Sequence, residues 1–132
     1  MRIAVDTNVL VRAVVWDDKT QAAAASRLLK EAEIIAIPLP CLCELVWVLR
    51  RVYGLGRTDI RAALQALLDA GNVAVNRPAV DAGLAMLDAG GDFADGLIAF
   101  EGRWLGGEVF VSFDAKAVAL LEKQGQAARV LV

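Results

Sequence analysis

The sequence predicts an α/β fold with a central, mostly parallel sheet of four to five strands, flanked by about seven helices. Short, nearly all-apolar segments alternate with longer helical segments along all 132 residues. Strands that are apolar on both faces are typical of a parallel sheet covered on both sides by helices. Because we find no repeat, low-complexity segment or linker, we expect a single domain spanning residues 1–132.

In the first half of the chain, segments typical of strands alternate with segments typical of helices, and capping residues, prolines and glycines stand at their boundaries. Asp6 ends the first apolar run and, with the polar residues after it, offers a helix N-cap. Pro38 stops the second strand, and Pro40 and Gly54 suit the first turn and the end of the next helix. The expected elements are strand 2–6, helix 8–15, helix 19–33, strand 34–38 and helix 39–54.

The second half repeats the alternation. Thr58 and Asp59 suit the cap of a helix that ends at Gly71, and Gly106 and Gly107 close a later one. Strand order does not follow from the sequence. The expected elements are helix 58–71, strand 72–76, helix 78–91, helix 94–107, strand 108–114, helix 115–125 and strand 128–132.

The composition restricts the possible chemistry. The chain contains no histidine, which excludes Ser-His-Asp triads, histidine general bases and His-ligated zinc. Its net charge is −2, so binding to nucleic acid would need local basic patches or a metal ion. Hydrophobic residues make up 58% of the chain, which predicts a large core or apolar surface covered by a partner.

We expect a cytoplasmic protein that does not enter a membrane. No apolar run reaches the length of about 18 residues that a membrane span needs, and the N-terminus lacks a signal-peptide layout. Cys41 and Cys43 have neither the spacing of a metal knuckle nor that of a local disulfide. We interpret them as small buried hydrophobic residues in a reducing cytosol.

Two aspartates follow expected strands at their carboxyl ends. Asp6 closes the first strand and Asp114 closes the strand 108–114, so both are expected at the same rim of a parallel sheet. One such residue alone would more often be a helix cap. Two in equivalent positions favour a site, because converging like charges repel unless a cation holds them.

Glu44 is the only charged residue between Leu39 and Leu49. We therefore expect it to be partly buried, where an ionised carboxylate needs a partner or a metal. The structural alternative is an ion pair with an arginine. The candidates for that pair are Arg12, Arg50 and Arg51.

The segment "GGDFADGLIAFEG" places Asp92 and Asp95 at the start of a helix. Either could cap it, but Asp95 leads directly into an apolar run, whereas Asp92 is expected outside. Oxygen ligands of this kind suit Mg²⁺ or Mn²⁺ and metal-assisted hydrolysis of a phosphodiester. The carboxylates expected to form this site are Asp6, Glu44, Asp95 and Asp114.

The blocks "VDTNVLV", the lone helical glutamate, "DFADGLIA" and "FVSFD" resemble, in this order, the PIN-domain ribonucleases, and most closely the VapC-type toxins. The resemblance covers essentially the whole chain and implies a three-layer fold. It implies that Asp6, Asp95 and Asp114 hold the metal ion, and that Glu44 completes the shell or orients the attacking water. The supporting polar residues would be Thr7, Asn8, Ser112 and, at the periphery, Asp92.

Two positions depart from the family pattern. Ser112 stands where threonine is usual, and it keeps a hydroxyl near Asp114. Gly96 stands where alanine is usual, which is expected to weaken that helix start slightly.

The resemblance further implies an endoribonuclease that depends on Mg²⁺ or Mn²⁺. Such a toxin forms a homodimer and is neutralised by a small antitoxin protein, sometimes in a higher assembly. Arg50, Arg51 and Arg57 gather near Tyr53 and are candidates to contact RNA, although a solvated helix end would look the same. Tryptophans in apolar helices could stack on bases but more often lie in a core or an interface. The three are Trp16, Trp47 and Trp104.

Other classes fit less well. A related nuclease that processes RNA without an antitoxin would carry the same acids. A phosphatase of the Asp-x-Asp type would need an acid where this chain has Asn8, and a receiver domain would need a lysine placed differently from Lys116. A non-catalytic binding module has no need of four intact acids.

Overall fold

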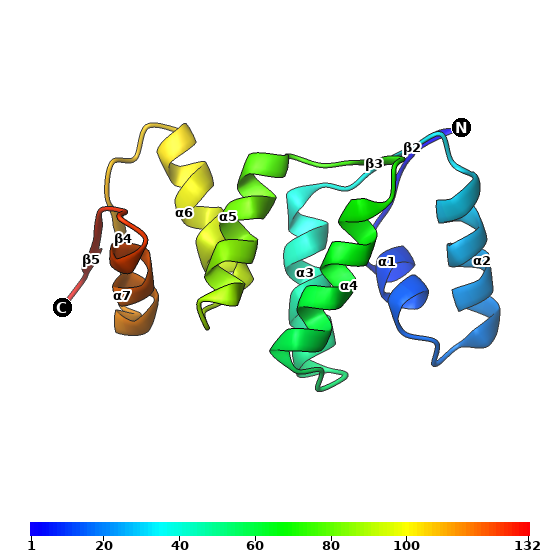
Figure 1. Cartoon of the computed structure of the whole chain (residues 1–132), viewed down its shortest axis with the longest axis horizontal. Helices are drawn as coiled ribbons and strands as arrows, with labels where there is room; N and C mark the ends of the chain where they lie inside the picture. Colours follow the sequence, from blue (N-terminus) through cyan, green and yellow to red (C-terminus); the bar gives the residue numbers. More distant parts are fainter. The chain divides into compact units, whose positions relative to one another are not determined.

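The computed structural model describes all residues, 1–132, and contains every expected helix and strand (Figure 1). Seven helices and five strands, all paired in parallel, confirm the α/β prediction. The chain divides into two compact units, which we name the N-terminal unit (Met1–Asn76) and the C-terminal unit (Arg77–Val132). The predicted single sheet of four to five strands is wrong, because the five strands form a three-stranded sheet in the first unit and a two-stranded sheet in the second.

The N-terminal unit is built on the sheet β1-β2-β3. Its strands are shorter than expected, and Ile35 of the central strand pairs with Ile3 on one side and Val73 on the other. Its elements are β1 (Arg2–Ala4), α1 (Thr7–Val14), α2 (Lys19–Glu31), β2 (Ile34–Ala36), α3 (Leu39–Arg51), α4 (Arg57–Asp69) and β3 (Val73–Ala74).

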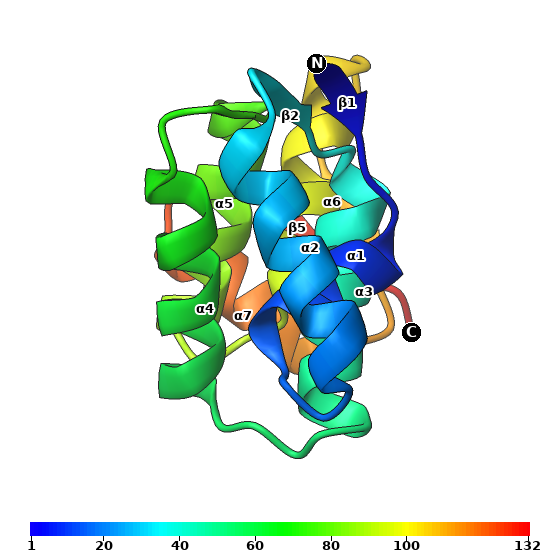
Figure 2. The same ribbon diagram turned by 90° about the vertical axis from the view of Figure 1, so that its right-hand side faces the viewer.

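The helices of this unit pack through their apolar stripes. Helix α1 lies against α2 and α3, and α3 also contacts α4; Figure 2 shows α1 and α2 side by side. Burying such side chains contributes roughly 1.5–3 kcal/mol each, which is what fixes the helix faces. Fully buried side chains of this core include Leu10, Ile35, Leu42, Leu45, Leu49 and Leu64.

One predicted helix start is wrong. Helix α4 begins at Arg57, with Gly56 at the cap position and no side-chain cap. Thr58 and Asp59 therefore lie inside the first turn, where the carboxylate of Asp59 favours the helix dipole without capping it.

The C-terminal unit combines two parallel strands with three helices. A cluster of buried side chains, Met86, Ala99, Ala117 and Leu121, joins its helices, and Phe110 of the sheet packs against it. Its elements are α5 (Arg77–Asp88), α6 (Phe93–Trp104), β4 (Phe110–Ser112), α7 (Ala115–Lys123) and β5 (Ala128–Val130).

Helices α5 and α6 pack against each other (Figure 1), and two glycines lie where they approach closely. A Cβ atom at Gly83 would lie 2.8 Å from the ring of Phe93. A Cβ at Gly96 would overlap the carbonyl oxygen of Ala82 and lie 2.7 Å from Cβ of Met86. Gly96 therefore permits the helix contact, and the expectation that it merely weakens the helix start misses this role.

The predicted burial of the cysteines is wrong. Cys41 and Cys43 are free thiols as expected, but both are only half-buried, and the thiol of Cys41 donates to the carbonyl of Val5 at 3.4 Å. Of the locations considered for the three tryptophans, the core is excluded, since their exposed fractions are 56% for Trp16, 59% for Trp47 and 82% for Trp104. None of the helices has the length and apolarity that crossing a bilayer takes.

Candidate active site

Asp6 is the N-cap of α1, directly after the first strand. Its backbone is extended, with φ −92° and ψ 176°, and its Oδ1 accepts a hydrogen bond of 3.2 Å from the amide of Val9. The side chain is exposed, and Oδ2 has no hydrogen-bond partner. The cap fixes the carboxylate and leaves one oxygen available, so capping does not compete with a role in a site.

Glu44 receives a hydrogen bond from the residue after Asp6. The hydroxyl of Thr7 donates to Oε2 of Glu44 at 3.1 Å, which joins the start of α1 to the second turn of α3. The expected partial burial of Glu44 is wrong: the side chain is exposed, because the core face of α3 is occupied by Leu45 and its neighbours. The alternative ion pair is also absent, since Glu44 has no arginine partner.

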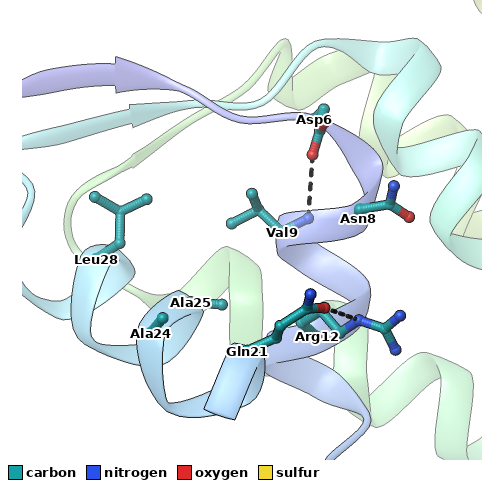
Figure 3. A pocket seen from close by; sticks show the side chains of 8 residues that line it. All are labelled: Asp6, Asn8, Val9, Arg12, Gln21, Ala24, Ala25 and Leu28. Atoms are coloured by element: carbon teal, nitrogen blue, oxygen red, sulfur yellow. Dashed lines mark hydrogen bonds between the residues drawn. The ribbon is translucent and has the colours of Figure 1, made fainter. Parts of the chain in front are cut away.

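A cavity of about 360 Å³ opens between α1 and α2 beside Asp6 (Figure 3). Asn8 shares its wall with Asp6 but forms no hydrogen bond to any of the candidate acids. The remaining wall is mostly apolar and includes Ala25 and Leu28. The carboxylate of Asp6 thus lies at the edge of an apolar hollow.

Asp92 and Asp95 have different roles at the start of α6. Asp92 is exposed and caps the helix, accepting from the amide of Ala94 at 3.1 Å. Asp95 is half-buried and makes no cap bond. Loss of hydration raises the pKa of the Asp95 carboxyl, and the nearby charges of Asp92 and Asp114 raise it further. The predicted placement of Asp95 toward the core and Asp92 outside is confirmed.

Asp114 is exposed and caps α7 immediately after β4. Its Oδ1 accepts from the amides of Lys116 at 3.0 Å and Ala117 at 3.2 Å, and Oδ2 stays without a partner. The hydroxyl of Ser112 accepts from the amide of Asp114 at 3.0 Å, so Ser112 supports the backbone of this residue rather than its carboxylate. Asp6 and Asp114 are therefore equivalent, each capping a helix at the carboxyl end of a strand.

The structure brings the candidate acids together within each unit. Asp6 and Glu44 belong to the N-terminal unit, and Asp95 and Asp114 to the C-terminal unit. No group of three or more cysteine, aspartate or glutamate side chains is arranged to hold a metal ion. The donor chemistry nevertheless fits Mg²⁺ or Mn²⁺, because the donors are all carboxylate oxygens and none of them forms an ion pair.

A polar network that the sequence did not reveal links α1, α2, the loop between them and the turn after α3 in the N-terminal unit. Asp17 accepts from the Arg12 guanidinium at 3.0 Å and from the Tyr53 hydroxyl at 2.8 Å, and Arg12 also donates to Gln21 at 2.7 Å. The bond from Tyr53 holds the pKa of the Asp17 carboxyl below its usual value. Asp17 and Tyr53 are far apart in sequence, and no local pattern links them.

The arginines proposed to contact RNA are all exposed near the C-terminal end of α3. Arg50 and Arg51 lie in the last turn of α3, and Arg57 begins α4. Tyr53, which the sequence grouped with them, is instead committed to Asp17.

The family of the chain follows from a match to the PIN domain over residues 3–122. The chain belongs to the PIN-domain family. The match includes all four candidate acids and extends over both units. PIN domains are generally nucleases and usually bind divalent metal ions. The sequence matches no curated protein closely enough to name a relative.

Proposed function

We propose that this PIN-domain protein is an endoribonuclease that depends on Mg²⁺ or Mn²⁺ and acts as the toxin of a toxin–antitoxin pair. The nuclease proposal rests on one observation, which is that the motif carboxylates have no basic partners. None of them is neutralised by a basic side chain, and the capping aspartates each keep Oδ2 without a partner. Acids held rigidly but left without a cation are what a metal site requires.

In this proposal the metal-binding acids are those that the resemblance implies, namely Asp6 of the N-terminal unit and Asp95 and Asp114 of the C-terminal unit. A bound ion would activate a water molecule and stabilise the leaving oxygen of the phosphodiester. The backbone amides at the starts of α1 and α7 fix Asp6 and Asp114 before any ion arrives. Thr7 orients the carboxylate of Glu44, which would complete the shell or position the water.

The electrostatics of the C-terminal unit support a cation. Desolvation and two neighbouring acids oppose the ionised form of Asp95. A divalent ion reverses both effects, because it replaces the lost hydration and compensates the negative charges. A bound divalent ion would therefore stabilise the ionised form of Asp95 and offset the negative charges of the two acids beside it.

The toxin proposal rests on the resemblance to VapC-type proteins and on exposed apolar side chains in both units. Trp47 and Val52 are exposed in the N-terminal unit, and Trp104 and Leu105 in the C-terminal unit. A homodimer interface and a small antitoxin would cover such surface. The proposed place of action is the cytoplasm.

The decisive experiment measures RNA cleavage by the purified protein with Mg²⁺ or Mn²⁺, with EDTA, and with the variant Asp6→Asn. We expect cleavage only with metal and a loss of at least about a hundredfold in Asp6→Asn, because a ligand matters more than the groups that orient it. Asparagine is as good an N-cap as aspartate, so the variant stays folded, which circular dichroism checks. Cleavage that persists in EDTA would overturn the metal-nuclease proposal.

A second experiment separates a toxin from a processing nuclease. Expression of the wild-type chain should arrest growth, expression of Asp6→Asn should not, and a small protein encoded beside the gene should restore growth and copurify. Light scattering of the purified chain tests the homodimer. Metal-dependent cleavage without growth arrest or a neutralising partner would favour a processing nuclease.

A further inference from the structure

The cavity between α1 and α2 has one charged group without a partner at its edge. Asp6 caps α1 through Oδ1, and its Oδ2 accepts no hydrogen bond (Figure 3). The apolar part of the wall is formed by Val9 of α1 and by Ala24, Ala25 and Leu28 of α2. The cavity volume of about 360 Å³ is sufficient for a small organic molecule. The cavity therefore has the size and the lining of a small-molecule site.

The opposite end of the cavity carries a cation that is already compensated. Arg12 donates to Gln21 at 2.7 Å and to Asp17 at 3.0 Å, so its guanidinium lies against a carboxylate. Figure 3 shows the bonded pair of Arg12 and Gln21 at the end of the lining away from Asp6. An anionic ligand would have to compete with Asp17 for this arginine, which disfavours anions in the cavity.

The uncompensated charge at the cavity is negative. Asp6 has no basic partner, and Thr7 holds the carboxylate of Glu44 at the same helix start. The amino end of a helix offers only about half of a positive charge, which the two carboxylates exceed. A ligand that matches both the charge and the lining therefore has a cationic head and a short apolar body.

We propose that the α1–α2 cavity binds a small primary amine with an apolar chain, and that the ammonium group contacts Oδ2 of Asp6. The chain lies over Ala24 and Leu28, away from water, and the ammonium keeps its other hydrogen bonds to solvent at the open edge. Asp6 is also a proposed metal ligand, so the consequence of this inference rests on the proposed function: amine and metal ion compete for one carboxylate. The cavity thereby places metal binding under the control of a small cationic molecule.

The test measures binding of hexylamine to the full chain in EDTA, followed by the backbone amide NMR signals of Val9 and Ala25. We expect saturable shifts with a dissociation constant on the order of 1 mM, because so small a ligand has few atoms to contribute. Hexanol and hexanoate, the neutral and anionic analogues of the same length, should bind about tenfold more weakly or less, since neither makes a charge-assisted bond to Asp6. Hexanol that binds as tightly as hexylamine would overturn the inference.

Two pairs of matched variants locate the ligand. Asp6→Asn should weaken hexylamine binding by about tenfold, whereas Asp18→Asn, at the N-cap of α2 and outside the lining, should change it little. Both variants keep a good cap, because asparagine caps as well as aspartate.

Ala24→Leu should weaken binding similarly, because the larger side chain occupies the cavity. Ala23→Leu is its control, since Ala23 is an equally exposed alanine of α2 that does not line the cavity. An unchanged affinity in either Asp6→Asn or Ala24→Leu would contradict the proposed binding mode.

Titration with Mg²⁺ separates this inference from the proposed nuclease. If both hold, Mg²⁺ displaces hexylamine, and hexylamine slows cleavage in proportion to its occupancy of the cavity. Hexylamine that binds through Asp6 but does not respond to Mg²⁺ would refute the proposed metal site and leave the amine site intact. Metal-dependent cleavage by a wild-type protein that does not bind hexylamine would refute the amine site alone.

Discussion

The two units hold their candidate acids in different physical settings. In the N-terminal unit, Asp6 and Glu44 are exposed and are fixed by single hydrogen bonds, one from a backbone amide and one from Thr7. In the C-terminal unit, Asp95 is half-buried on a helix packed tightly against its neighbour. Desolvation and like charges raise the pKa of this acid.

If the proposed metal ion binds, this difference indicates two ways to prepare a carboxylate for it. An exposed acid needs only to be oriented, because water already stabilises its charge. A half-buried acid is held in place by packing, and its ionised form is disfavoured relative to that of a hydrated carboxylate until a cation lies beside it. We therefore expect substitutions in the C-terminal unit to act through packing and ionisation, and those in the N-terminal unit to act through orientation.

The largest effect is expected where α5 and α6 touch. Gly96→Ala should lower the free energy of unfolding by about 1–3 kcal/mol, since the new methyl group meets backbone and Cβ atoms of α5. Thermal unfolding measures it. Gly102→Ala is the matched control on the same helix: nothing lies within 4 Å of its Cβ position, so it should stabilise the protein by about 0.5–1 kcal/mol. A Gly96→Ala variant as stable as wild type would contradict the close contact.

Thr7→Val should reduce metal-dependent cleavage by about tenfold and leave the melting temperature nearly unchanged. The substitution keeps the shape of the side chain but removes the donor to Glu44, so the carboxylate loses its orientation. Thr7→Ser keeps the hydroxyl and should restore most of the rate. If Thr7→Val cleaves at the wild-type rate, orientation of Glu44 by Thr7 does not matter for the reaction.

Asp95 should make the metal-free protein less stable as the pH rises. A folded-state pKa above the usual 3.8 means that the native state binds this proton more tightly than the unfolded chain. Stability contributed by the protonated form is therefore lost as the pH rises through the raised pKa. Denaturant unfolding in EDTA across pH 3.5–7 should show this decline in wild type and a flatter curve in Asp95→Asn. Asp59→Asn, an exposed acid of α4, should keep the wild-type slope.

The smallest effect is expected in the exposed network of the N-terminal unit. Tyr53→Phe removes the hydrogen bond that lowers the pKa of Asp17, so that pKa should rise toward 3.8. Carboxyl NMR titration measures it. Because the groups are exposed, the melting temperature should change by no more than the error of the measurement. An unchanged Asp17 titration would show that Tyr53 does not donate to it in solution.

Local sequence patterns determined much of this molecule. The alternation of short apolar segments with helical segments, together with the element ends marked by Pro38, Gly54 and Gly71, predicted the type and order of every helix and strand. The same patterns placed Asp6 and Asp114 at strand ends, and both are helix caps there. These features depend on neighbours within a few residues, which is the range over which caps and periodicity act.

Tertiary structure decided what depends on residues far apart in the chain. The exposure of Glu44 followed from which face of α3 met the core, and the donor to its carboxylate came from α1. The bond of Tyr53 to Asp17 and the fit of Gly96 against α5 likewise joined separate elements. A single sequence records neither which faces meet nor how closely, because packing selects one arrangement among many that share the same local pattern.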